Sequence, residues 1–151
     1  MTEEKLVRIA RNHQGDFRLF IDKFNLPQDF KVKLGIGEMK DFPQVRNVAY
    51  TQMVSPREFK IVFAPKWDRL TDENYIAVLR HEYGHVLHLM YPQIFKLIKE
   101  EYGVSLHPSQ EEIFSDFAAS FIWNDHIFYD DNLIQTITPT DIDLRPRHLG
   151  W

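Results

Sequence analysis

The chain has 151 residues, of which 44% are hydrophobic and 26% are charged, so residues 1–151 can bury a core as a single domain and are not a disordered or low-complexity chain. The net charge of −4 argues against a dedicated nucleic-acid binder, which usually carries a basic face. The chain has no cysteine, which excludes disulfides, thiolate nucleophiles and every cysteine-based zinc site.

The chain carries no signal for export or for membrane insertion. Residues 1–17 are charged throughout and lack the apolar core that a signal peptide needs. No segment approaches the roughly 20 apolar residues of a membrane span. The absence of cysteine also fits a reducing compartment. We therefore expect a cytoplasmic protein that binds neither nucleic acid nor a membrane.

Residues 1–30 are expected to form an N-terminal helical segment. Apolar residues at spacings near three and four predict an amphipathic helix over residues 3–25, which Gly15 can break and Pro27 ends. Beyond it, apolar residues alternate with lysine and glycine over residues 31–39, a pattern that predicts a half-buried strand.

A strand pair and a long helix follow. Residues 47–54 and 58–64 are rich in β-formers and flank a turn at 55–57, which predicts a hairpin. Thr71 is a good N-cap followed by two acidic residues, where negative charge suits the helix dipole. The helix that starts there is expected to run to about Met90.

The last third of the chain predicts two more helices and a tail. Residues 92–103 are expected to form a shorter helix that ends at Gly103, and another helix is expected to begin near Ser109. Residues 130–151 are rich in turn formers and are expected to be an irregular C-terminal tail. The elements together predict an α+β fold, with a small sheet packed against helices.

The sequence HEYGH places His81 and His85 four residues apart on the long helix, with Glu82 beside them. Residues at that spacing share one helix face, so both imidazoles can bind one ion, and zinc is a suitable metal. Glu82 can reach a water activated by the metal and act as general base. The alternative is that the two histidines merely fall four apart on an amphipathic helix and bind no metal.

A catalytic zinc site needs a third protein ligand, and Glu112 is the favoured candidate. Two alternatives remain open at this point. Ser109 and Glu112 also fit a capping box, in which the glutamate bonds the N-cap amide instead of a metal. Glu111 is the neighbouring carboxylate, but it points about 100° away from the face that carries Asp116.

Three other residues are expected to have supporting roles. Asp116, one turn beyond Glu112, can accept the free N–H of a ligating histidine and fix its orientation. His88 lies one turn after His85 and is interpreted as a packed histidine or one that supports a ligand. Gly84 is costly in mid-helix, which predicts that another backbone approaches closely there.

These residues resemble the gluzincin metallopeptidases, in which a helix bearing H-E-x-x-H faces a second helix bearing a glutamate ligand. The matching residues are His81 to His85 and Glu112-x-x-Ser115-Asp116, and the matching region is about residues 58–122. In size and layout the chain is most similar to the compact ImmA/IrrE-type metallopeptidases. It departs from that group at Ser115, where alanine is usual, and it has no evident helix-turn-helix partner domain.

The resemblance implies a zincin-like fold and a Zn²⁺ cofactor held by His81, His85 and Glu112, with Glu82 as the catalytic base and Asp116 supporting a ligand histidine. It also implies a protein or peptide substrate, such as a repressor-like protein. In such folds an edge strand near the helix binds an extended peptide, and residues 47–54 or 58–65 are candidates for that strand.

The sequence therefore predicts a zinc metalloendopeptidase. Two alternatives come from other functional classes. One is a zinc-binding regulatory or interaction protein with little hydrolytic activity, and the other is a phage accessory protein with no metal.

Overall fold

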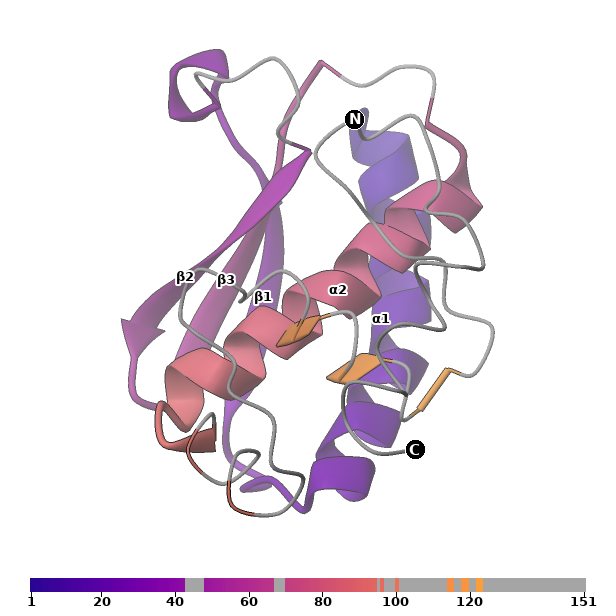
Figure 1. Cartoon of the computed structure of the whole chain (residues 1–151). Coiled ribbons are helices and arrows are strands. Elements are labelled where there is room, and N and C mark those ends of the chain that lie inside the picture. The colour runs from indigo at the N-terminus through magenta and orange to yellow at the C-terminus, as the bar shows by residue number, and fades with distance from the viewer. Residues whose placement is uncertain are drawn as a thin grey trace.

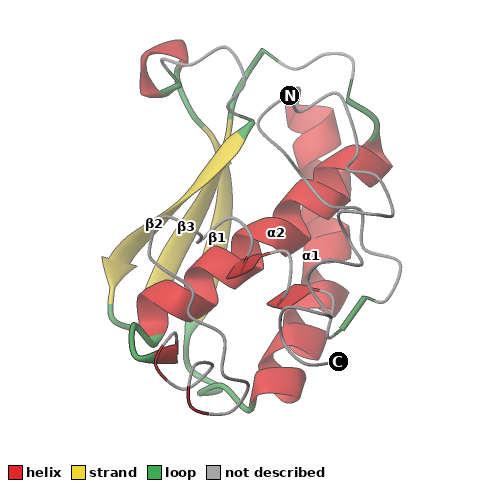
Figure 2. Ribbon diagram, in the orientation of Figure 1, coloured by secondary structure: helices red, strands yellow, loops and turns green. Residues whose placement is uncertain are grey.

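Two helices pack on one face of a three-stranded sheet in the computed structural model, which gives an α+β architecture (Figure 1, Figure 2). The structure describes residues 1–42, 48–66, 70–94, 96, 100, 114–115, 118–119 and 122–123. Its elements are α1 (Glu3–Phe24), β1 (Lys31–Ile36), a 3-10 helix (Met39–Asp41), β2 (Ala49–Ser55), β3 (Glu58–Phe63) and α2 (Asp72–Met90). These bounds confirm the hairpin and the long helix to Met90.

The strand order β1-β3-β2 puts β3 at the centre of the sheet. Strand β2 runs antiparallel to β3, as the hairpin predicts, whereas β1 runs parallel to β3, a pairing that local sequence patterns did not predict. Thr51 on β2 pairs with the fully buried Ile61 on β3. Cross-strand partners share a face of the sheet. Thr51 therefore faces the helices from a sheet edge.

Helix α1 continues through Gly15, where the sequence suggested that it can break. Thr2 caps its first turn by accepting a hydrogen bond from the Lys5 amide at 3.2 Å, and Asn25 ends it in a left-handed conformation with φ of 51°. Gly15 lies on the exposed side of the helix, and its cost in helix propensity is about 1 kcal/mol. Burial of apolar residues such as Phe20 on the opposite side outweighs that cost.

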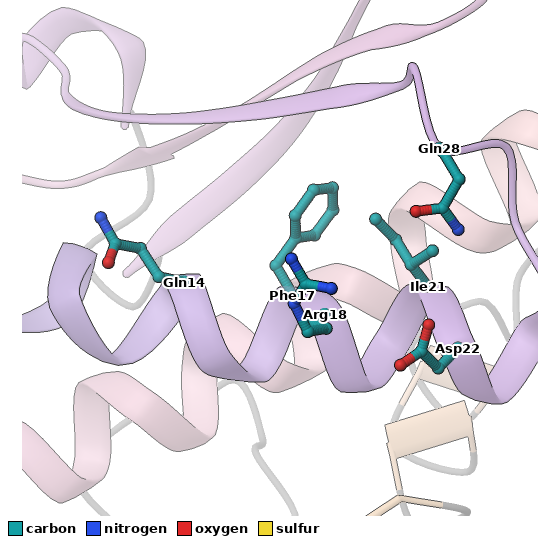
Figure 3. A pocket seen from close by; sticks show the side chains of 6 residues that line it. All are labelled: Gln14, Phe17, Arg18, Ile21, Asp22 and Gln28. Carbon is teal, nitrogen blue, oxygen red and sulfur yellow. The ribbon is translucent and has the colours of Figure 1, made fainter.

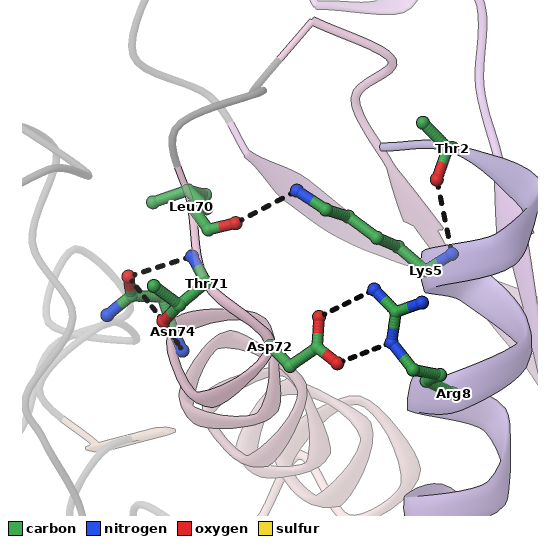
Figure 4. A network of polar contacts seen from close by, with 7 residues as sticks. All are labelled: Thr2, Lys5, Arg8, Leu70, Thr71, Asp72 and Asn74. Atoms are coloured by element: carbon green, nitrogen blue, oxygen red, sulfur yellow. Dashed lines mark hydrogen bonds and ion pairs between the residues drawn. The ribbon is translucent and has the colours of Figure 1, made fainter.

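The N-terminal ends of the two helices are held together by charged and polar contacts (Figure 4). The Arg8 guanidinium donates to both carboxylate oxygens of Asp72, at 2.6 and 3.1 Å. Lys5 donates from its Nζ to the Leu70 carbonyl at 3.2 Å. Thr71 caps α2 as the sequence predicts, through a reciprocal bond with Asn74. These contacts fix where α2 begins relative to α1.

Farther along, a buried carboxylate links α1 to α2. Asp16 is 7% exposed and accepts hydrogen bonds from Asn12 at 2.7 Å and from the Arg80 Nε at 2.9 Å. The Arg80 guanidinium lies 4.6 Å from the centre of the Trp123 ring. Arg80 therefore joins α1, α2 and residue 123 through one side chain, by an ion pair on one side and a cation–π contact on the other.

His13 bridges α1, β1 and α2 as a neutral imidazole. Its Nε2 lies 3.1 Å from the Val32 carbonyl oxygen, which can only accept, so Nε2 carries the proton. Its Nδ1 then accepts a hydrogen bond from the Tyr83 hydroxyl. Burial lowers the pKa of His13, an effect that the Val32 carbonyl and Asp16 partly oppose, and burial also raises the pKa of Tyr83 well above its ordinary value.

None of the helices among the described residues has the length and apolarity that crossing a bilayer requires.

We predict that His13 makes the fold less stable in acid. The unfolded chain takes up a proton near pH 6.5, whereas the folded state keeps His13 neutral to a lower pH. The free energy of unfolding should therefore be fully supported above about pH 6.5 and fall as the pH drops below it. Urea titrations between about pH 5 and pH 8 should show a weaker pH dependence for His13→Gln than for the wild type. Equal pH dependence in the two proteins would contradict the prediction.

Candidate metal centre

One turn of α2 is buried on every side. His81, Glu82, Tyr83 and Gly84 are consecutive, and all four are buried. Because successive helical residues point about 100° apart, four in a row face four directions. Glu82 contacts β2, Tyr83 contacts α1, and Gly84 faces Ser115. Residues 81–84 are therefore shielded from bulk water, whereas His85, the last residue of the motif, is partly exposed.

The two histidines of the motif point the same ring nitrogen at each other. The Nε2 atoms of His81 and His85 are 3.1 Å apart, and the Glu82 Oε2 atom lies 3.9 Å from the His81 Nε2. His81, Glu82 and His85 each offer a ligand atom, and these atoms all lie within 4.8 Å of one another. Among the described residues this is the one group of three or more such side chains, and it can hold a metal ion.

The spacing of the two nitrogens fits a tetrahedral metal ion such as zinc. Two nitrogens bound to one tetrahedral zinc at about 2.0–2.1 Å lie about 3.3 Å apart. The observed 3.1 Å between the His81 and His85 Nε2 atoms is close to that separation. The same distance also fits an N–H···N hydrogen bond in the metal-free protein. The pair can therefore share either one proton or one cation without a change in backbone geometry.

A hydroxyl group on the sheet orients the Glu82 carboxylate. The Thr51 Oγ1 atom lies 2.8 Å from the Glu82 Oε1 and 3.3 Å from the Glu82 backbone oxygen, and it donates to them. Glu82 is only 2% exposed, so this bond compensates for much of the water that the carboxylate loses. With Oε1 held by Thr51, Oε2 is the oxygen nearer to the histidines.

The other ring nitrogen of His85 is held by two residues. The His85 Nδ1 atom lies 2.8 Å from the Nε2 of His88 and 3.0 Å from the Oγ of Ser115. His88 and Ser115 are both buried. His85 is therefore fixed at both nitrogens, by His81 on one side of the ring and by this pair on the other.

The close backbone approach that the sequence predicts at Gly84 is present. A Cβ atom built on Gly84 would lie 2.3 Å from the Ser115 Cα and 2.5 Å from the Ser115 oxygen. No real side chain fits at such distances. Glycine at position 84 therefore allows the segment with Ser115 to come close enough for its hydroxyl to reach His85.

The structure brings together His81, Glu82 and His85 as the sequence predicts. Glu112 and Asp116 lie outside the described residues, as does Glu111, so their roles remain predictions. Sequence reasoning missed Thr51. The signal for it in the sequence was weak, because Thr51 is simply a polar residue in the middle of a predicted strand. Its pairing with the buried Ile61 on the next strand is seen only in the structure.

A separate hollow on α1 shares no residue with the histidine cluster (Figure 3). Phe17 and Ile21 give it an apolar part, and Arg18 and Asp22 add charged groups. The remaining lining residues are Gln14 and Gln28. It contains no histidine or other usual zinc ligand except Asp22, so the candidate centre stays at α2.

Comparison of the chain with protein-family models, with curated proteins and with solved structures finds no match.

Two glycines in helices should respond oppositely to the same substitution. Gly84→Ala forces a methyl group against the Ser115 backbone, so we expect a loss of about 1–3 kcal/mol in the free energy of unfolding. Gly15→Ala is the matched control, because nothing lies within 4 Å of its added Cβ. It should gain about 0.5–1 kcal/mol from helix propensity. Urea unfolding followed by circular dichroism measures both, and stabilisation of both variants would refute the close contact at Gly84.

Proposed function

We propose that the protein is a zinc-dependent metallopeptidase with a zincin-like arrangement, which hydrolyses peptide bonds in protein or peptide substrates. One observation carries the proposal: two imidazole Nε2 atoms lie 3.1 Å apart in a buried turn, and the carboxylate beside them is held by a threonine. Hydrolysis requires a general base next to the metal, and Glu82 can serve as that base. A site that only binds metal would not need it.

In this proposal His81 and His85 hold the zinc through Nε2, and Glu112 is the third protein ligand. The position of Ser115 is compatible with Glu112 as that ligand. Ser115 contacts His85, and three residues of chain reach at most about 11 Å. A glutamate three positions before Ser115 is therefore within covalent reach of the same centre. Asp116 retains its proposed role of supporting a ligand histidine.

A bound zinc ion would supply Lewis acidity, which polarises a carbonyl oxygen and makes water nucleophilic near neutral pH. Glu82 would accept a proton from the attacking water at Oε2 while Thr51 keeps Oε1 in place. It would then deliver that proton to the amine nitrogen as the carbon–nitrogen bond breaks. The products are a carboxylic acid and an amine, and the net reaction consumes one water.

The sheet suggests how a substrate would lie. Strand β3 has a neighbour on each side, so of the two candidate strands only β2 retains an edge without a partner among the described strands. An extended peptide can add to such an edge through main-chain hydrogen bonds. Strand β2 also carries Thr51, which bonds the proposed base. We therefore propose an extended or unfolded segment, for example in a repressor-like protein, as the substrate.

The first test is metal content combined with hydrolysis. Wild-type protein purified without chelators or a metal-binding tag should contain close to one zinc per chain, and Glu112→Ala should retain much less. Glu82→Gln should keep its zinc, yet cleave casein about 10²–10⁴-fold more slowly than the wild type.

The outcomes separate the three functions. Zinc that is bound without hydrolysis above the Glu82→Gln level indicates a zinc-binding regulatory protein. No bound zinc, and none taken up on addition, leaves an accessory protein with a chance motif and refutes the proposal.

A second test concerns Thr51 as a positioning residue for Glu82. Thr51→Val removes the hydroxyl at nearly constant shape, so the carboxylate loses the bond that orients it. We expect kcat on casein to fall about tenfold to a hundredfold, with KM and zinc content unchanged. Thr51→Ser keeps a hydroxyl at the same position and should restore most of kcat. Equal kcat in the valine and serine variants would rule out this role.

A further inference from the structure

The chain contains a third buried histidine next to the candidate metal centre. His88 is 4% exposed, and its Nε2 lies 2.8 Å from the His85 Nδ1, with the two rings nearly perpendicular at 83°. The His88 ring also packs against Phe114, with centroids 5.8 Å apart. It does not point at the nitrogens that face each other in the His81–His85 pair, so it is not a third ligand of that pair.

Cation binding by His85 would determine whether His85 or His88 donates the hydrogen bond between them. A neutral imidazole has one N–H group and one lone pair. If His85 binds a cation through Nε2, the lone pair is on Nε2 and the proton is on Nδ1. Of the two described residues that contact the His85 Nδ1, His88 is the closer, at 2.8 Å, and its Nε2 accepts that proton through its lone pair.

The reverse direction would disable the centre. If the His88 Nε2 carried a proton and donated it to the His85 Nδ1, the His85 proton would sit on Nε2. That N–H would then point at the His81 Nε2, 3.1 Å away, and occupy the place of a cation. The direction of the hydrogen bond between His88 and His85 therefore decides whether the His85 Nε2 presents a lone pair or an N–H group to His81.

We propose that His88 is a positioning residue that accepts the His85 Nδ1–H and so keeps the His85 Nε2 available as a metal ligand. This inference rests on the proposed function only in assuming that the His81–His85 pair binds zinc. Partners of this kind fix the ring orientation and raise the basicity of a ligand histidine. In the sequence prediction that task fell to Asp116, which lies outside the described residues, whereas His88 makes the contact directly.

Ser115 is the competing partner at the same nitrogen, and two facts favour His88. The His88 distance is shorter, 2.8 against 3.0 Å. A serine hydroxyl can also donate as well as accept, so it fits either proton position on His85 and selects neither. Each neutral tautomer of His88 makes its Nε2 either a donor or an acceptor, so the bond from His88 has one direction and selects one proton position on His85.

The test uses zinc alone as the probe and needs no substrate. Zinc affinity is measured by competition with a chromophoric chelator for the wild type, His88→Phe, His88→Gln and Ser115→Ala. Phenylalanine keeps a ring against Phe114 but accepts no hydrogen bond, so its zinc affinity should fall about 10–100-fold. Glutamine offers an amide oxygen near the position of the lost nitrogen and should restore affinity to within about threefold of the wild type. Ser115→Ala removes the other group that contacts the His85 Nδ1 and should weaken zinc affinity less than His88→Phe does, since the serine hydroxyl does not select the tautomer.

The outcomes are distinct. A wild type that binds zinc, with His88→Phe binding equally well, overturns the role of His88 and leaves the metal centre intact. A wild type that binds no zinc overturns the metal centre as well. Thermal unfolding by circular dichroism shows whether each variant is folded.

A measurement on the wild type decides the question even if His88→Phe does not fold. Long-range ¹H–¹⁵N spectra of zinc-loaded protein with labelled histidines report which ring nitrogens carry protons. We expect a proton on the His85 Nδ1 and an unprotonated Nε2 on His88. A protonated His88 Nε2 cannot accept, and finding one would overturn the proposal.

Discussion

The candidate centre depends on the complete burial of one turn of α2. From His81 to Gly84 the helix is covered by the sheet, by α1 and by the segment with Ser115. A buried carboxylate or imidazole loses its hydration and must recover it through partners within the protein. Glu82 finds one on β2, and the histidines find theirs in one another. The same burial lowers the effective dielectric constant and strengthens each of these contacts.

The polar contacts on the two sides of α2 differ in whether the paired groups are complementary. Toward α1, every interaction has complementary partners: Asp16 with Arg80, and the Tyr83 hydroxyl with His13 and the Val32 carbonyl. This side holds the helices together and needs nothing from outside. Away from α1, two imidazoles present the same nitrogen to each other across 3.1 Å, beside the carboxylate that Thr51 holds. Two like groups in that arrangement are complementary only when a proton or a cation lies between them, which is why we place the chemistry on this side.

Local sequence patterns were sufficient where a contact lies within one helix or one turn. The four-residue spacing of His81 and His85 fixes their shared face, and Thr71 predicts the start of α2. The cost of Gly84 predicts that some backbone lies close, but not that it belongs to Ser115. Contacts between distant segments were not predictable in this way. The parallel pairing of β1 with β3 and the bond from Thr51 to Glu82 join residues 27 and 31 positions apart, and nothing local in the sequence encodes either.

Ser115 departs from the metallopeptidase motif and also contacts the candidate metal centre. Alanine is usual at this position in the compact metallopeptidases that the motif resembles, so the hydroxyl is this chain's own departure. The structure places that hydroxyl 3.0 Å from the His85 Nδ1, the same nitrogen that His88 approaches. An alanine would satisfy the close packing against Gly84 equally well, because the contact involves only the Ser115 backbone. Packing therefore explains the small size of residue 115 but not its oxygen. The oxygen is explained by His85, whose Nδ1 it reaches as a second polar partner beside His88.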